Sequence, residues 1–518
     1  MVQQRLPAHS RVTFGWPWAT TSRPPRDEWE RRLRMPTPEH TPTCLVPQFS
    51  PDASDRNPRT TSRHGPTVSV TISDVWKRPS LVALARCSKA REFRPTIIGL
   101  KMKLGFNLYL LFVVSWFLHL GARFPVLGAI RFDLLLVAVI GLILIFNRSG
   151  ANPVKTGTEK YLKLLIVFCI LTIPLVEWPG SVLSRGLEAL AKASVFYFFT
   201  VAFVDSEQRI KKLVLTFVAL QVFRVVEPLY LHVTEGYWGS VASMADWEYL
   251  ERLSGAPHDV VNPNGLAFVI CTALPFLYFL APLSRAHRLA FVMFSPLCIY
   301  ALVLTGSRTG MLGLAVIAVG FVAKARHKVL GAVGVVLAVL VGFSMLGSDL
   351  QDRYLSMFVK GTKNEATAEG RIEGVIGSFE VAMRRPLFGH GLGTSQEANW
   401  NFAGEDKPAH NLYAEAAQEI GFIGLAILLL LIKSIFVAFH DCRKAYSQGR
   451  GKASLKCMVD AMQIWLVLNV VFSFASYGLT SYEWYLLGGF SVALRRLAAR
   501  ISEAEVSPDG KLQFQAKA

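Results

Sequence analysis

Residues 407–432 read KPAHNLYAEAAQEIGFIGLAILLLLI. The second half of this stretch is apolar without a break, and with its flanks it is long enough to cross a bilayer as a helix. The first half is polar and places His410 at the mouth of that helix, with Glu415 and Glu419 one helical turn apart. The stretch therefore predicts a membrane helix with titratable side chains where it enters the lipid. His410 either takes part in chemistry there or only caps and hydrates the helix end.

The composition of the whole chain is that of a membrane protein. Of its 518 residues, 52% are hydrophobic and only 18% are charged, whereas soluble domains carry about 25% charged residues. The net charge of +18 is concentrated in the first hundred residues and in short loops between apolar segments, which argues against a nucleic-acid partner. None of the seven cysteines forms a C-x-x-C pair, so neither a zinc site nor a thioredoxin-like motif is predicted.

The start of the chain differs from the rest. Residues 1–101 are rich in Pro, Arg, Ser and Thr and lack apolar periodicity, which predicts a disordered basic tail. Met102 stands directly before an apolar segment, so a second interpretation is that the natural start is Met102 and the preceding residues are a wrongly assigned extension. We assign no function to residues 1–101.

About twelve apolar segments follow, and the predicted fold is an all-α polytopic membrane protein. The predicted spans lie near residues 105–122, 132–146, 161–177, 187–204, 210–231, 264–282, 288–305, 309–323, 329–346, 412–439, 459–478 and 482–496. The predicted organisation is spans one to nine within 102–346, including an outer loop at 232–263, then a long loop at 347–411, spans ten to twelve within 412–496, and a tail at 497–518.

The distribution of Lys and Arg predicts the sidedness of these spans. Every second connection is basic, as are the residues that follow the last span. By the positive-inside rule these connections and both termini are cytoplasmic. The long loops at 232–263 and 347–411 then face outward, where functional loops are expected.

The second outer loop contains a predicted helix. Its apolar residues recur at helical spacing, at Ile372, Val375, Ile376, Phe379 and Met383. Charged residues separate them, so the segment is typical of an amphipathic helix that lies on a membrane surface.

Arg308 lies in the turn TGSRTG between two closely spaced spans, at the predicted outer face. An unpaired charge this close to hydrocarbon is unfavourable, so the guanidinium needs an anionic partner. Its planar fork matches phosphate oxygens, which favours a diphosphate clamp. The alternative is an arginine that extends to lipid phosphates.

Three motifs, taken together, resemble the O-antigen ligase family. They are TGSRTG, GRIEGVIGSFEVAMRRPLFGHGLGT and AHNLYAEAAQEIGFIG, in this order and on one predicted membrane face. The resemblance extends by motif from Arg252 to Phe439 and, by the layout of spans, from Met102 onward. It implies a GT-C-like fold in the bacterial inner membrane. It also implies transfer of a glycan from undecaprenyl diphosphate to lipid A-core at the periplasmic face, with no cofactor, metal or nucleotide sugar.

The resemblance also implies which residues carry the chemistry. The histidine of the family falls on His410, and its arginines fall on Arg308 and Arg371. Arginines stabilise the charge that develops on a leaving diphosphate, and a neutral histidine at a helix N-terminus can take a proton from the acceptor hydroxyl. The sequence departs from the family at Gly374 and Val375, where relatives often have tryptophan.

Four further residues are candidate substrate contacts. Arg252 matches an arginine that precedes a Pro-Asn turn in many relatives, and Asn264 belongs to that turn. Glu415 and Glu419 either line the cavity or have structural roles, such as ion pairing with an arginine.

Other polar and aromatic residues of the outer loops are given ordinary structural interpretations. His390 is interpreted as a loop position among glycines that form a tight turn, and His258 as solvent-exposed. Trp238, Trp247 and Tyr249 either stack on sugars or belong to the aromatic belt of the membrane interface.

Three alternatives remain open. A polymerase of the same superfamily would extend a lipid-linked glycan, and a protein O-oligosaccharyltransferase would transfer the glycan to Ser or Thr. A solute transporter is the alternative from another class. We find no internal repeat of the kind that transporters show, and the candidate polar residues gather at one membrane face.

Overall fold

The computed structural model describes residues 101–146, 156–239, 251–259, 261–325, 327–344, 351, 365–404, 409–447, 453–476 and 478–506. All of these belong to one compact unit. Within them every regular element is a helix, and no strand occurs. Trp247 and Tyr249, residues 1–100 and the end of the C-terminal tail lie outside the described residues.

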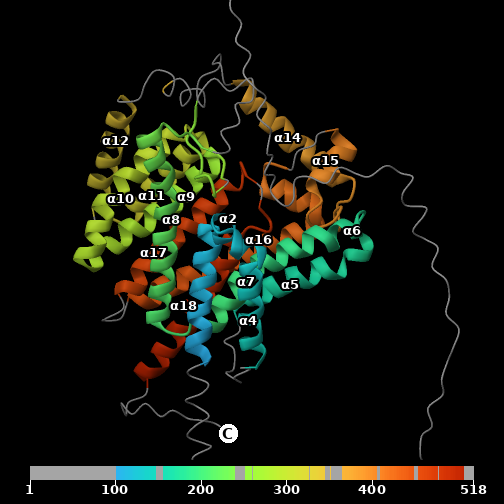
Figure 1. The fold of residues 1–518 in the computed structure, drawn as a ribbon, viewed down its shortest axis with the longest axis horizontal. Coiled ribbons are helices and arrows are strands. Elements are labelled where there is room, and N and C mark those ends of the chain that lie inside the picture. The colour runs from blue at the N-terminus through green and yellow to red at the C-terminus, as the bar shows by residue number, and fades with distance from the viewer. Residues whose placement is uncertain are drawn as a thin grey trace, which may run out of the picture. The chain divides into compact units, whose positions relative to one another are not determined.

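Each of the twelve predicted spans coincides with a helix (Figure 1). The first is Lys101–Leu118. The others are α4 (Phe132–Phe146), α5 (Gly157–Leu171), α7 (Leu187–Phe203), α8 (Glu207–Glu235), α9 (Pro263–Leu280), α10 (Arg285–Leu304), α11 (Arg308–Lys324), α12 (Lys328–Ser344), α16 (Leu412–Ser447), α17 (Ala453–Phe472) and α18 (Tyr482–Val506). Short helices precede α4 and α7, namely α2 (Leu120–Arg123), α3 (Pro125–Ala129) and α6 (Pro179–Ser181). The outer loop adds α14 (Glu365–Met383) and α15 (Ser395–Ala403).

Seven helices of the described part of the chain are long and apolar enough to cross a membrane. They are Lys101–Leu118, Pro179–Phe203, Glu207–Glu235, Pro263–Leu283, Arg285–Leu304, Leu412–Ser447 and Ala453–Phe472. Helices α4 and α5 have 15 residues and α11 and α12 have 17, which gives about 22 to 26 Å at 1.5 Å per residue, short of a hydrocarbon core of about 30 Å. The prediction of a multi-pass helical protein is confirmed, and a count of twelve spans stays a prediction.

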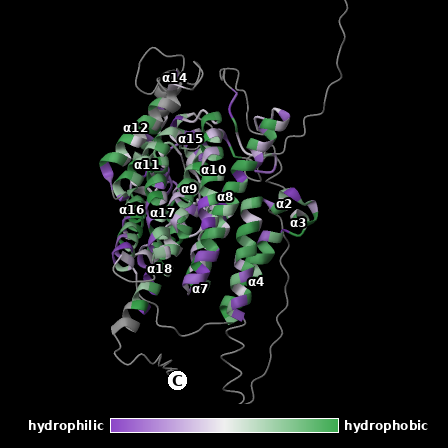
Figure 2. Cartoon of the chain, turned by 90° about the vertical axis from the view of Figure 1, so that its left-hand side faces the viewer, coloured by the Kyte–Doolittle hydropathy of each residue, from purple (hydrophilic) through white to green (hydrophobic). Residues whose placement is uncertain are grey.

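Hydrophobic residues, green in Figure 2, predominate along most of these helices, and many of them are exposed. Leu134 and Leu142 on α4 are 59% and 53% exposed, and Leu330 on α12 is 72% exposed. Water would not stabilise this many exposed aliphatic side chains, whereas lipid would, so the surface is suited to a bilayer.

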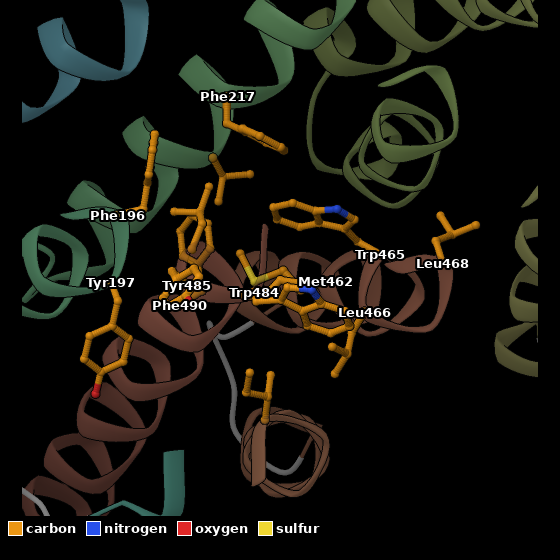
Figure 3. Packing of buried hydrophobic residues seen from close by; sticks show 14 of the residues in the cluster. Phe196, Tyr197, Phe217, Met462, Trp465, Leu466, Leu468, Trp484, Tyr485 and Phe490 are labelled. Atoms are coloured by element: carbon orange, nitrogen blue, oxygen red, sulfur yellow. The ribbon is translucent and has the colours of Figure 1, made fainter. Parts of the chain in front are cut away.

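Helix α17 lies at the centre of the fold and packs against α9, α11, α16 and α18. Its Trp465 is fully buried and stacks on Phe217 of α8, with ring centroids 4.8 Å apart. Figure 3 shows this core, in which side chains of α7, α8, α17 and α18 meet. The core fixes α17, and the C-terminal end of α17 in turn positions the candidate site.

The predicted amphipathic helix is present as α14, although it is longer than the predicted stripe. Val381 and Ala382 are buried, and α14 packs against α16. Ile376 and Met383 of the predicted apolar stripe are 54% and 63% exposed. Contact between this stripe and a membrane surface stays a prediction.

Candidate functional site

Arg252 and Asn264 lie together at the start of α11. Arg252 Nε donates to the carbonyl oxygen of Thr305 at 2.8 Å, and its Nη2 donates to Oδ1 of Asn264 at 2.9 Å. The same Oδ1 accepts from the hydroxyl of Ser307 at 2.8 Å. Ser307 is the N-cap of α11, since its Oγ accepts from the backbone N–H of Gly310. This network fixes the turn from which Arg308, the first residue of α11, extends.

His410 lies at the start of α16, where the chain is held by the end of α17. The backbone N–H of Leu412 donates to the carbonyl oxygen of Ser473 at 2.9 Å, and Nδ2 of Asn411 donates to that of Phe474 at 3.1 Å. Oδ1 of Asn411 caps the helix by accepting from the N–H groups of Tyr413 and Ala414. His410 directly precedes this cap and is exposed.

The end of α17 brings these two regions to the same end of the bundle. Phe472, next to Ser473, lies with its ring centroid 4.9 Å from that of Phe268, one turn into α9 from Asn264. It also fills the space beside Gly313 of α11, where an added Cβ would lie 2.6 Å from the Phe472 ring. The first two turns of α9 and α11 and the start of α16 therefore lie around the C-terminal end of α17. Arg252, Asn264, Arg308 and His410 thus lie toward one end of the bundle, while the membrane face of this end and the roles of these residues stay predictions.

This grouping favours an anion. Each helix N-terminus carries a partial positive charge and N–H groups without helical acceptors. The starts of these three helices and the guanidinium group of Arg252 lie toward this end of the bundle, and Arg308 is the first residue of α11. Partial positive charge at helix N-termini and guanidinium groups both favour phosphate oxygens.

Glu419 holds the glycine-rich segment 386–394 against α16. Its Oε2 accepts from the N–H of Gly393 at 2.8 Å and its Oε1 from the N–H of Ser395 at 3.2 Å. Its own carbonyl oxygen accepts from Gly391 N–H at 2.9 Å. Glu419 is only 3% exposed. The carboxylate therefore has a structural partner, and direct substrate contact by Glu419 stays a prediction.

Glu415 holds a second segment in the same way. Its Oε2 accepts from the N–H groups of Gly478 at 2.7 Å and Leu479 at 3.0 Å, just before α18 begins. An arginine is one partner expected for this carboxylate from the sequence, whereas in the structure backbone N–H groups donate to it. Substrate binding by Glu415 stays a prediction.

Gly421 breaks α16 at the boundary between its polar and apolar halves. Its backbone has φ of 68° and ψ of 178° inside a helix that otherwise runs from Leu412 to Ser447. A Cβ added there would lie 2.3 Å from the carbonyl oxygen of Leu387. The close approach lets the glycine-rich segment pair with residues 418–422, so this glycine is required by both conformation and space.

We expect Gly421→Ala to destabilise the protein by about 2 kcal/mol or more, because a left-handed conformation costs about 1–2 kcal/mol for a residue with Cβ and the Leu387 carbonyl must also move. Thermal unfolding of the purified protein in detergent measures this. Gly374→Ala is the matched control, since Gly374 lies in α14 with no atom within 4 Å of an added Cβ. Equal melting temperatures for the two variants would contradict the assignment.

His390 is buried and links two segments of the chain. Its interpretation as an ordinary loop position is therefore wrong. The side chain has no exposed surface. Its Nδ1 lies 2.9 Å from Oε2 of Glu177 and its Nε2 lies 3.0 Å from the carbonyl oxygen of Val381. The imidazole also stacks on Trp178, with centroids 5.6 Å apart. His390 thus joins the outer loop to the segment between α5 and α7.

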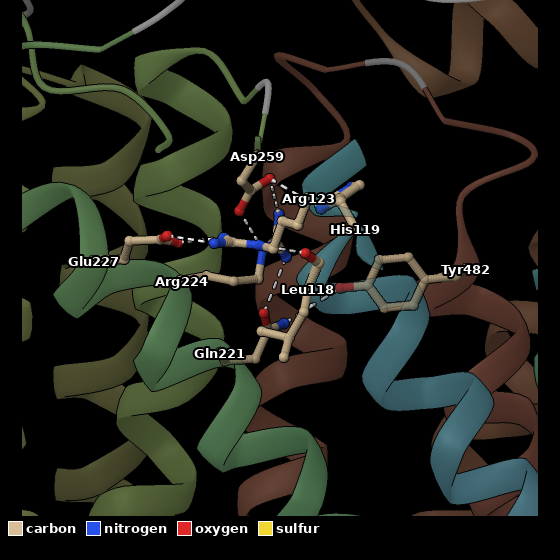
Figure 4. Close-up of polar contacts among 8 residues, drawn as sticks. All are labelled: Leu118, His119, Arg123, Gln221, Arg224, Glu227, Asp259 and Tyr482. Carbon is tan, nitrogen blue, oxygen red and sulfur yellow. Dashed lines mark hydrogen bonds and ion pairs between the residues drawn. The ribbon is translucent and has the colours of Figure 1, made fainter. Parts of the chain in front are cut away.

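A buried charged network lies under the first outer loop (Figure 4). Arg224 of α8 donates to both carboxylate oxygens of Asp259, with Nη2 3.0 Å from Oδ1, and both side chains are almost fully buried. Arg123 makes a second two-pronged pair with Glu227. Nδ1 of His119 lies 3.9 Å from Asp259. The Arg224–Asp259 pair was missed in the sequence analysis and anchors the loop that carries Arg252.

The remaining predicted residues are placed as follows. Arg371 belongs to α14, and the structure describes its backbone but not its side chain. His258 is exposed, as predicted. Trp238 packs against His232, with ring centroids 4.3 Å apart. Among the described residues, no group of three or more His, Cys, Asp or Glu side chains could hold a metal ion.

Comparison with known families identifies the central part of the chain. Residues 289–429 match the family model described as O-antigen ligase. This chain carries an O-antigen ligase family domain. The resemblance predicted from sequence is thereby confirmed, and the domain contains Arg308, Arg371, His410, Glu415 and Glu419. Arg252 and Asn264 lie before it but contact its Ser307 and Thr305. No curated protein matches the chain.

The O-antigen ligase domain and the apolar helices together establish the broad class. The chain is a multi-pass helical membrane protein that carries an O-antigen ligase family domain.

Proposed function

We propose that this protein is a glycan ligase of the bacterial inner membrane. It transfers a polysaccharide from undecaprenyl diphosphate to a sugar of lipid A-core, at the periplasmic face. The observation that carries the proposal is the grouping of Arg308 and His410, with Arg252 and Asn264, at one end of a bundle of apolar helices. This end has the positive charge expected of a diphosphate site, and the imidazole of His410 belongs to the same end.

The donor diphosphate binds at the start of α11. Arg308 supplies a guanidinium that pairs with two phosphate oxygens, and the N-terminus of α11 adds its partial positive charge. Arg252 positions this end of α11 through Asn264 and Thr305. Arg371 adds a further cation from the outer loop. As the bond between the anomeric carbon and the diphosphate oxygen breaks, these groups stabilise the negative charge that the diphosphate acquires.

His410 acts on the acceptor. A hydroxyl of the acceptor sugar attacks the anomeric carbon, and its proton passes to the imidazole of His410 as the new glycosidic bond forms. The neutral form of the His410 imidazole is the one that accepts this proton. The carboxylates of Glu415 and Glu419 hold the polypeptide around this residue.

Deletion of the gene distinguishes a ligase from the related activities. We expect the surface glycolipid to lose all long-chain material on a gel while long lipid-linked polymer accumulates in the membrane, with both restored by a plasmid copy. Glycolipid capped with a single repeat unit would instead identify a polymerase, and loss of glycan from proteins would identify a protein O-oligosaccharyltransferase. Unchanged glycolipid would overturn the whole proposal.

A further inference from the structure

A second charged cluster lies at the opposite end of α17 from the candidate site. Asp460, in the second turn of α17, accepts from three cations on three helices. Nζ of Lys324 (α11) is 2.6 Å from Oδ1, Nε of Arg443 (α16) is 2.7 Å from Oδ1, and Nζ of Lys456 (α17) is 3.0 Å from Oδ2. Lys324 also donates to Gln463 at 2.6 Å.

The cluster has an excess of positive charge. Three cations against one carboxylate leave a formal charge of +2. Two other described acids touch α16 or α17 near this end, and each already has a cation. Asp441 pairs with Arg495 at 3.6 Å, and Glu207 pairs with Lys211 at 2.6 Å. These acids do not neutralise the cluster, so an anion from outside the described chain would be attracted to it.

The cations divide into an inner one and two outer ones. The Asp460 side chain is 3% exposed and that of Lys324 is 14% exposed, so these two form a buried pair. Arg443 and Lys456 are 39% and 38% exposed. In the described structure Arg443 contacts Asp460 through Nε, which leaves both terminal nitrogens of its guanidinium to donate to another acceptor. Two N–H donors of a guanidinium and an ammonium group match the oxygens of a phosphate.

The surroundings indicate that the phosphate belongs to a lipid. Val319, five residues before Lys324 on α11, is 68% exposed, and Val437, six residues before Arg443 on α16, is 46% exposed. At 1.5 Å per residue these apolar side chains lie roughly 8–9 Å deeper along the bundle than the cations. Lipid acyl chains therefore surround these helices at the depth of the valines, and lipid headgroups lie at the depth of the cluster, where Arg443 and Lys456 are partly exposed.

We propose that Lys324, Arg443 and Lys456 form a binding site for the phosphate of an anionic phospholipid, on the membrane face opposite the candidate active site. Basic groups at the ends of membrane helices on the face with excess positive charge attract anionic lipids. Asp460 holds the three cations in one place, and the outer pair binds the headgroup. The site is independent of the glycan-transfer reaction and of its donor.

The test compares the purified protein in detergent with added phosphatidylglycerol, phosphatidylcholine or inorganic phosphate, by thermal unfolding and by counting retained lipids in native mass spectrometry. We expect phosphatidylglycerol alone to raise the melting temperature and to remain bound. In Arg443→Gln/Lys456→Gln, affinity for this lipid should fall about tenfold or more, since each basic residue contributes about 1 kcal/mol to anionic lipid binding. The buried Lys324–Asp460 pair is retained in this variant, and Lys456→Gln alone serves if the double variant does not fold.

Arg285→Gln/Arg288→Gln is the matched control. Both arginines are exposed in the first turn of α10, at the same end of the bundle as Lys324, and the charge change is identical. The control should bind phosphatidylglycerol like the unaltered chain. Equal loss in both double variants would show a diffuse charge effect and overturn the site. An equal response to inorganic phosphate would overturn the assignment to a lipid, and an equal response to phosphatidylcholine would overturn any anion preference.

Discussion

Replacing His410 with alanine is expected to slow glycan transfer by about 10²- to 10⁴-fold, the range that a positioned general base contributes. His410 precedes the cap of α16 and is exposed at the face where the N-termini of α9, α11 and α16 meet. Alanine removes the proton acceptor and leaves Asn411, which forms the cap, in place. Fold and membrane insertion should therefore be unchanged. The rate is measured with purified protein, a lipid-linked glycan donor and a lipid A-core acceptor.

His258→Ala is the matched control for this experiment. His258 is also an exposed histidine of an outer loop, next to the buried Asp259. It has no role in the proposed reaction, and its variant should transfer glycan at the unaltered rate. Near-normal transfer by His410→Ala, with equal amounts of protein in the membrane, would rule out His410 as the base. A parallel loss in both variants would point to a general effect on the outer loops.

The helices of this protein were predictable from sequence because their apolar segments are long and their polar breaks are clear. The boundaries of α9 and α11 follow from local caps, since Asn262 and Ser307 each accept from an N–H three residues on. The kink at Gly421 was not predicted. The sequence there is continuously apolar, and the positive φ of Gly421 and the approach of the Leu387 carbonyl, 34 residues earlier, are evident only in the structure.

The partners within the site were less predictable. His410 and Arg308 were identified from their positions at the ends of apolar segments, and Arg252 and Asn264 through the family resemblance. Nothing in the sequence near His390 indicates Glu177, which is 213 residues away. Long-range pairs of this kind depend on how helices pack, and one sequence carries no local signal for them.

Arg224 and Asp259 show the same limit, although they are only 35 residues apart. Arg224 reads as a lone arginine within an apolar helix, which by itself indicates a buried or functional charge with an unknown partner. Asp259 reads as an ordinary loop acid beside His258. Their pairing becomes evident only in the fold, where Asp259 of the outer loop points toward Arg224 of α8 (Figure 4).

Arg224→Ala is expected to destabilise the protein by about 3–5 kcal/mol, since removal of one partner leaves the other charge buried and unpaired. The Asp259 side chain is 3% exposed and cannot reach water without movement of the loop. Gln221, which accepts from Arg224 at 3.1 Å, also loses its donor. Thermal unfolding should show a large decrease in melting temperature, and limited proteolysis should cut within residues 251–262.

Two comparisons separate this effect from a general loss of charge. Arg185→Ala removes an outer-face pair with Glu397 in which the arginine is 51% exposed, and exposed pairs contribute at most about 1 kcal/mol. Arg224→Met combined with Asp259→Leu removes both buried charges and should recover much of the stability. If Arg224→Ala unfolds at the temperature of Arg185→Ala, the buried pair does not anchor the loop.

Because the same loop carries Arg252, which positions the start of α11, release of Asp259 should also lower glycan transfer at temperatures where the helices remain folded.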